Sequence, residues 1–206
     1  MTARKRNENY DYRAAANQYA HLADEFLRTY FVLGVNNVRL NVRYFIMAHC
    51  LELAFKASLA NRSVPIDYGI HNLADLEADL VQQGDSCFEQ LRPDANAREV
   101  FTRICHRNVR EFHISDWQDH QEALELLLCY AYNADLKYGM DKAGRNILAV
   151  TISTVIMNSR FLGYIACARR NFLDRGQLGR EIIKFVAQIE QRWPKLFSGA
   201  SAILQT

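Results

Sequence analysis

The sequence predicts an all-α protein, a bundle of about seven helices, on three observations. Apolar residues recur at helical spacing, at positions i, i+3, i+4 and i+7, along most of the chain. Only three prolines and nine glycines occur among the 206 residues, so few positions would interrupt a long helix. Half of the residues are apolar, which suits a folded chain with a substantial core.

The N-terminal half is predicted to hold three of these helices. Residues 1–9 are polar and basic, and we expect them to be a disordered tail. Helical periodicity begins at Tyr12 and continues to about Leu33, where a turn separates it from a second helix that ends near Asn61. The second helix is apolar nearly all round, which is typical of a helix at the centre of a domain. A shorter helix follows over about 73–83.

The few polar residues of the central helix lie on one stripe. His49, Glu52 and Lys56 stand at i, i+3 and i+7, among apolar neighbours. Glu52 precedes Lys56 by four residues, the favourable order for an ion pair on a helix. We therefore predict a buried Glu52–Lys56 pair, since either charge alone in the interior would be costly.

Further helices are predicted over the C-terminal half. One begins at Pro93, and another runs from the capping box at 115–118 to Lys137 or Tyr138. Segment 147–157 is open to two interpretations, because its β-branched residues favour a strand. No turn separates it from the helical pattern that follows, and no partner strand is visible, so we expect a helix. A last amphipathic helix is expected to stop at Pro194.

These elements predict one domain with an extension. The domain spans 10–194, with its core at about 12–138 and a C-terminal helical extension at 145–194. Residues 195–206 are mostly small or polar, and we expect a loose tail.

Three short segments together resemble a known family. They are His49-Cys-Leu-Glu-Leu-Ala-Phe-Lys56, then His71-Asn-Leu-Ala-Asp-Leu76, and Asp135-Leu-Lys-Tyr-Gly139 at the end of a later helix. In this order they resemble the HEPN domains, small α-helical domains of prokaryotes and some eukaryotes. The resemblance covers about 12–138 and implies a HEPN-like helical bundle.

The resemblance also points to a candidate catalytic pair. HEPN ribonucleases carry an Arg and a His separated by four to six residues, often with Asn directly after the Arg. Arg107, Asn108 and His113 match this pattern. RNA cleavage without a metal needs a proton acceptor and a proton donor, which His supplies near neutral pH, and a guanidinium offsets charge on the phosphate. Positions i and i+6 lie about 120° apart on a helix, and family members commonly join two copies across a dimer.

The basic residues Arg103, His106 and Arg110 share the face that carries this pair, and Asn108 directly follows Arg107. We assign Arg103, His106, Asn108 and Arg110 as candidate RNA- or phosphate-binding residues. Two alternatives stay open: an ordinary solvated basic face, and a face that binds phosphate or RNA without cleaving it. The same spacing also occurs at Arg43 and His49, inside the apolar central helix, where we interpret it as accidental.

The resemblance implies a metal-independent endoribonuclease of a prokaryotic toxin–antitoxin or antiviral defence system. RNA or a nucleotide would be its ligand, and a cognate antitoxin its partner. The alternative is a non-catalytic HEPN-fold interaction module or nucleotide- or RNA-binding module. We also expect a homodimer, in which the C-terminal helices complete their burial through Ile152, Ile156 or Phe161.

Several classes of function find no support in the sequence. It contains no Gly-rich phosphate loop, nucleophile elbow or Cys-x-x-Cys pair, the patterns of NTPases, hydrolases and thiol redox folds. His106, His113 and His120 recur every seven residues, about 10 Å apart on a helix, which is too far for one zinc ion. We therefore expect neither a metal nor a cofactor.

The sequence also bears on location. It shows no secretory leader and no long uncharged apolar stretch, so we expect no membrane segment. Five cysteines, an odd number and widely spaced, indicate free thiols in a reduced, cytoplasmic protein. The net charge of +2 says little about partners.

Overall fold

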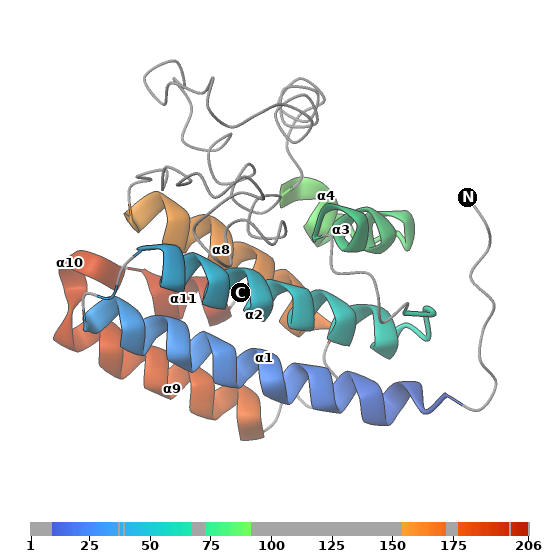
Figure 1. Ribbon diagram of the computed structural model, residues 1–206, viewed down its shortest axis with the longest axis horizontal. Helices are drawn as coiled ribbons and strands as arrows, with labels where there is room; N and C mark the ends of the chain where they lie inside the picture. Colours follow the sequence, from blue (N-terminus) through green and yellow to red (C-terminus); the bar gives the residue numbers. More distant parts are fainter. Residues whose placement is uncertain are drawn as a thin grey trace, which may run out of the picture.

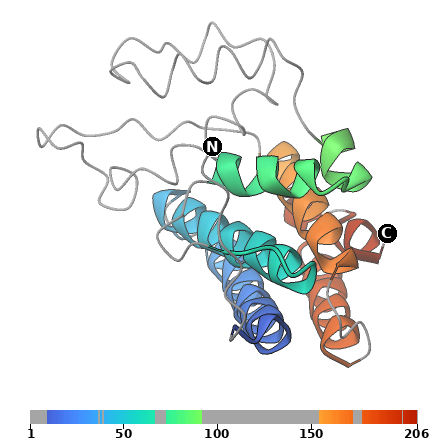
Figure 2. The ribbon, with the colours of Figure 1, turned by 90° about the vertical axis from the view of Figure 1, so that its right-hand side faces the viewer.

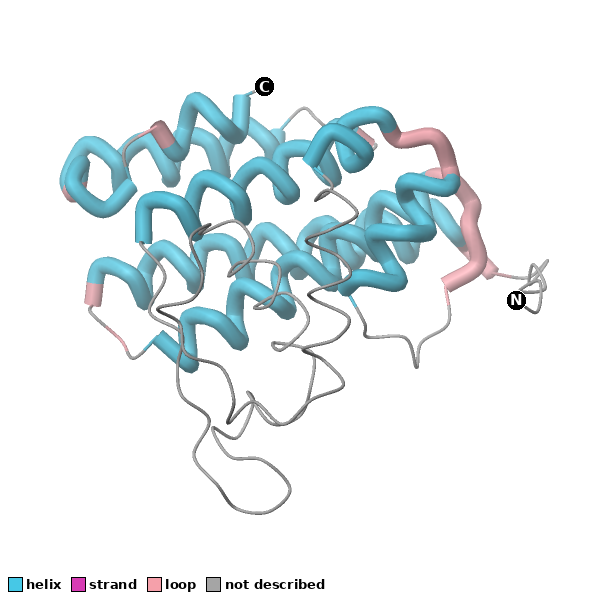
Figure 3. The backbone as a smooth tube through the Cα atoms, turned by 90° about the horizontal axis from the view of Figure 1, so that it is seen from above, coloured by secondary structure: helices cyan, strands magenta, loops and turns pink. Residues whose placement is uncertain are grey.

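The computed structural model describes residues 10–36, 38, 40–66, 73–91, 154–171, 177–197 and 199–205. Within these ranges the regular elements are all helices and no strand occurs, as Figure 3 shows. The prediction of an all-α chain is confirmed to this extent. Eight helices lie in the described ranges, whereas about seven were expected for the whole chain. The helices predicted between 92 and 153 lie outside them.

The first two helices form an antiparallel hairpin (Figure 1). Helix α1, Tyr12–Val35, begins where predicted because the Asp11 carboxylate accepts a hydrogen bond from the Ala14 N–H at 2.9 Å. Helix α2, Leu40–Asn61, is buried on every side from Cys50 to Ala60. The central position predicted for α2 is therefore confirmed.

Two shorter helices cross over this hairpin. Helix α3, Leu73–Gln82, packs on α2 and ends at Gly84, whose φ of +75° is a conformation that glycine adopts readily. The sequence did not indicate helix α4, Ser86–Leu91. Asp85 begins it, because the Asp85 Oδ1 accepts hydrogen bonds from the backbone N–H groups of Cys87 and Phe88.

The C-terminal helices complete the bundle. Helix α8, Thr154–Arg170, packs beside α2, and helix α9, Gln177–Arg192, packs beside α1. Figures 1 and 2 show α1 and α9 as one layer, α2 and α8 as the next, and α3 with α4 across the far side of that second layer. The helical interpretation of 147–157 holds from Thr154 onward, and residues 147–153 lie outside the described part. No helix in the described ranges is long and apolar enough to cross a membrane.

The expectation of a loose tail at 195–206 is wrong. Two short helices occupy this stretch, α10 at Pro194–Phe197 and α11 at Ala200–Gln205, and both pack against α8 and α9. Phe197 and Leu204 enter the core, with 1% and 6% of their surface exposed. Pro194 does not only stop α9. It also opens α10, since the first position of a helix needs no backbone N–H donor.

The expected dimer contact at Phe161 is also wrong. Phe161 is fully buried within the chain, with its ring centroid 4.7 Å from that of Tyr30. Helices α2 and α8 contribute side chains to one common core, so a single bundle has room for both apolar helices. Ile152 and the side chain of Ile156 lie outside the described part.

Candidate functional site

The candidate catalytic pair lies outside the described residues. Arg107 and His113 fall between Leu91, the last residue of α4, and Thr154, the first residue of α8. The same applies to the candidate RNA-binding residues, namely Arg103, His106, Asn108 and Arg110. Their grouping into one site therefore stays a prediction.

The second pair with this spacing, Arg43 and His49, is described and does not form a site. Arg43 is buried, with its guanidinium 5.2 Å from the centre of the Tyr30 ring. The His49 side chain is 39% exposed and packs edge-on against Phe26, with centroids 4.6 Å apart. The two side chains meet different neighbours, which supports the interpretation of this spacing as accidental. An Arg and a His at i and i+6 on a helix do not by themselves converge.

The charged stripe of α2 is a buried ion pair, as predicted. The Lys56 Nζ lies 2.7 Å from the Glu52 Oε1, and the two residues are 4% and 6% exposed. His49 Nδ1 lies 3.6 Å from the other oxygen of Glu52. Each charge thus has a close partner of opposite sign, so the stripe stabilises the centre of the bundle.

A second buried ion pair connects α1 with α8. The Arg169 guanidinium donates a hydrogen bond to the Asp24 carboxylate, and Asp24 is 4% exposed. The neighbouring Arg170 is exposed at the end of α8, whereas the Arg169 side chain is only 11% exposed. Burial raises the pKa of Asp24 to about 6, although the Arg169 and Arg28 charges act to lower it.

The thiol of Cys50 lies close to this pair and is unreactive. Its Sγ donates a hydrogen bond to the Ala23 carbonyl at 3.2 Å, and the residue is fully buried. Burial and then the nearby Asp24 charge raise the pKa of the Cys50 thiol well above its ordinary value. The thiolate that a nucleophile requires is therefore disfavoured here.

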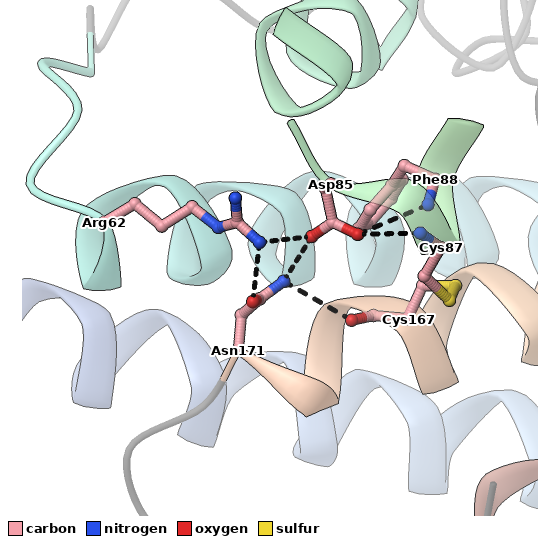
Figure 4. The surroundings of a disulfide bond; sticks show 6 residues. All are labelled: Arg62, Asp85, Cys87, Phe88, Cys167 and Asn171. Carbon is pink, nitrogen blue, oxygen red and sulfur yellow. Dashed lines mark hydrogen bonds and ion pairs between the residues drawn. A yellow bond between two sulfur atoms is a disulfide. The ribbon is translucent and has the colours of Figure 1, made fainter. Parts of the chain in front are cut away.

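A third polar cluster of the described part joins three elements (Figure 4). Asp85 Oδ2 accepts hydrogen bonds from Arg62 Nη2 at 2.6 Å and from Asn171 Nδ2 at 2.7 Å. Arg62 Nη2 also donates to Asn171 Oδ1 at 2.9 Å. We call Arg62, Asp85 and Asn171 the polar clamp. It fastens the end of α2 and the α3–α4 turn to the end of α8.

A disulfide between Cys87 on α4 and Cys167 on α8 lies beside the polar clamp (Figure 4). The Cα atoms of the two residues are 5.7 Å apart, inside the range that a disulfide spans. The expectation that these cysteines are free thiols is wrong, whereas Cys50 is free. The two cysteines are 80 positions apart in the sequence, and nothing in the sequence pattern indicated their pairing.

The described residues contain no group of three or more His, Cys, Asp or Glu side chains placed to hold a metal ion. The two buried ion pairs and the polar clamp stabilise the bundle, and none of these clusters resembles the acid–base pair that RNA cleavage requires.

Comparisons with known proteins give no relative: no protein-family model, no curated protein and no solved structure matches the chain significantly.

Proposed function

We propose that the protein is a HEPN-like, metal-independent endoribonuclease in which Arg107 and His113 act on RNA. The observation that carries the proposal is the sequence Arg107-Asn-Val-Arg-Glu-Phe-His113 in a helical chain. The other support is the segment from His49 to Lys56, which resembles the family in sequence and lies in helix α2.

Each residue of the pair has a definite task in the proposed reaction. The 2′-hydroxyl of RNA attacks the adjacent phosphorus, which requires one group to accept its proton and another to protonate the leaving 5′-oxygen. His113 takes one of these two roles, and its counterpart in a second copy takes the other. Arg107 binds the phosphate oxygens and stabilises the charge that develops on them. Arg103, His106, Asn108 and Arg110 hold the RNA backbone.

The proposal includes a biological setting, which follows from the same resemblance. The enzyme works as a homodimer in the cytoplasm, within a prokaryotic toxin–antitoxin or antiviral defence system. A cognate antitoxin restrains it.

The proposed metal-independent activity is tested by incubating the purified protein with RNA in the presence of EDTA. Wild type should cleave, and Arg107→Ala and His113→Ala should each lose at least about 100-fold in rate, the usual contribution of a general acid or base. Arg180→Ala and His21→Ala are matched controls, since both residues are exposed on described helices, and both should keep full activity. Equal cleavage by wild type and both site variants would reject the pair.

A second candidate is a module that binds RNA or nucleotides without cleaving them. It is favoured by the wide angle between Arg107 and His113 on a single regular helix. In that case wild type binds RNA without cleavage, and the Arg103→Ala, Arg110→Ala double variant loses affinity. Light scattering adds a further test, because a monomer mass near 23.8 kDa would leave each Arg–His pair without a facing copy.

A further inference from the structure

Helix α4 depends on few attachments. It has six residues, too few for a helix to persist alone in water. Its one fully buried side chain among those described is Phe88, whose ring centroid lies 5.1 Å from that of Phe55 and 6.1 Å from that of Tyr164. A covalent attachment runs from Cys87 to Cys167. Among the described contacts, α4 is therefore held by the Asp85 cap, the ring contacts of Phe88 and the disulfide.

The polar clamp lies next to the disulfide but does not include it. Asp85 precedes α4 and pairs with Arg62 and Asn171. Those hydrogen bonds join α2, the α3–α4 turn and the end of α8, whatever the state of the two sulfur atoms. Loss of the disulfide would leave the turn and the capped start of α4 fastened, and would loosen the rest of that helix from α8.

We propose that Cys87 and Cys167 form a reversible redox site, whose reduction by a cellular dithiol loosens α4 from α8 and leaves the rest of the bundle folded. The proposal does not require ribonuclease activity, but it rests on the cytoplasmic setting proposed above. It gives the two cysteines a role that suits the proposed cytoplasmic setting, where thiol reductants are abundant and a permanent disulfide is uncommon.

The exposure of the two cysteines determines which sulfur atom a reductant attacks first. Cys87 is half-buried, whereas Cys167 is 3% exposed, so a reductant thiolate reaches Cys87 first. Attack on the Cys87 sulfur forms a mixed disulfide, and Cys167 leaves as a thiolate that takes a proton. The second thiol of the reductant then attacks the mixed disulfide and releases Cys87 as a thiol. Two electrons and two protons pass to the protein, and the reductant becomes a disulfide.

The consequence of reduction is local because the elements differ in burial. From Cys50 to Ala60 every residue of α2 is buried, and the Glu52–Lys56 pair lies inside this stretch. Once the covalent bond is gone, the described contacts of α4 are those of the Phe88 ring and the hydrogen bonds that its first turn donates to Asp85. Segments with few buried contacts open first. Residues 92–153 lie between the two cysteines in the sequence, so the disulfide also decides whether they belong to a closed covalent ring.

Redox titration of the full chain tests the first part of the proposal. Purified protein is equilibrated with dithiothreitol, a dithiol, at varied ratios of its reduced and oxidised forms. The protein thiols are then trapped by alkylation and counted by mass spectrometry. We expect Cys87 and Cys167 to convert together between disulfide and thiols as the reduced form comes into excess. A pair that never forms the bond, or one that stays oxidised in fully reduced dithiothreitol without denaturant, would overturn the proposal.

Hydrogen exchange tests the second part. Reduction should speed exchange of the α4 amides by more than about tenfold and leave the amides of α2 unchanged. The Cys87→Ser, Cys167→Ser double variant should show the fast α4 exchange with or without reductant. Cys50→Ala is the matched control, because it removes the free buried thiol and should keep the response to reductant. Unchanged α4 exchange, or faster exchange throughout the bundle, would contradict a local release.

Discussion

The ammonium of Lys56 donates a hydrogen bond of 2.7 Å to the Glu52 carboxylate, one turn earlier on α2, and both side chains are buried. Such a pair is costly to take out of water, and its mutual attraction offsets that cost only while both partners are present. Removal of one partner is therefore more harmful than removal of both.

Glu52→Leu should lower the free energy of unfolding by about 3–5 kcal/mol, since it leaves the Lys56 charge buried without its partner. The Glu52→Leu, Lys56→Met double variant should recover a large part of this loss, because it leaves no buried charge. Urea unfolding followed by circular dichroism measures both values.

An exposed position on α1 provides the control for this pair. Glu25→Leu removes a carboxylate that lies on the surface, and it should change the unfolding free energy by less than about 0.5 kcal/mol. Equal unfolding midpoints for wild type and Glu52→Leu would mean that water reaches the pair.

Asp24 should make stability depend on pH between about 4 and 6. Burial raises its pKa from 3.8 in the unfolded chain to about 6 in the fold, in spite of Arg169. Within this window the folded chain binds more protons than the unfolded chain, so stability falls as pH rises. The shift of about two pKa units corresponds to at most about 3 kcal/mol. Asp24→Asn lacks this contribution, so its free energy of unfolding should increase relative to that of wild type as pH rises from 4 to 7.

Chemical denaturation at several pH values measures the free energy of unfolding of wild type and of Asp24→Asn. Contributions from other titrating groups cancel in the difference between the two. The opposite slope, with wild type gaining on Asp24→Asn as pH rises, would mean that the attraction of Arg169 outweighs burial. The pKa of Asp24 would then be below its ordinary value.

Local patterns explain which parts of this structure the sequence predicts well. The start of α1 at Tyr12, the end of α2 at Asn61 and the Glu52–Lys56 pair all depend on residues within a few positions of one another. Caps, turns and helical periodicity carry this information. The short helices α4, α10 and α11 hold too few residues to show a period, and contacts with the rest of the bundle stabilise them.

Caps, turns and periodicity could not predict the pairs between residues that are far apart in the sequence. Arg169 and Asp24 are 145 positions apart, and Asp85 joins Arg62 to Asn171 across 109 positions. Their partners become neighbours only when α1, α2, α4 and α8 pack together. Of the candidate site, the sequence supplies the residue types and spacing of Arg107 and His113. Whether they converge depends on packing of this long-range kind.

Glu190 should stabilise the C-terminal helices in a pH-dependent way. Its carboxylate accepts hydrogen bonds from Ser201 N at 3.1 Å, from the Ser201 hydroxyl and from Gly199 N. Burial acts to raise its pKa, but these hydrogen bonds outweigh burial and lower it. Glu190→Gln should cost about 1 kcal/mol near neutral pH, the usual value of a lost cap. The cost should shrink as pH falls below the ordinary pKa of 4.5, and disappear once pH passes the lowered pKa of Glu190 and the folded wild type is protonated too. A loss that is the same at pH 3 and pH 7 would exclude the charge as its cause.

Gly34 should not tolerate a methyl group, although it lies in a helix. Glycine to alanine usually stabilises a helix by about 1 kcal/mol. At Gly34, however, an added Cβ would lie 2.8 Å from the Phe197 Cζ and 3.2 Å from the Arg43 Nη2. Phe197 is buried and packs on Phe31 with centroids 4.9 Å apart, so its ring cannot move aside freely. Gly34→Ala should therefore cost about 1–3 kcal/mol by overpacking.

A double-mutant cycle separates this overpacking from any effect on the helix itself. Phe197→Leu removes the ring edge that the new methyl group would meet, at its own cost in buried area. In that background Gly34→Ala should cost at least about 1 kcal/mol less than in wild type, since contacting residues couple by 0.5–3 kcal/mol. Thermal or urea unfolding of the four proteins gives the coupling. Additive losses would show that Phe197 does not lie against Gly34, and the packing of α10 on the end of α1 would then be wrong.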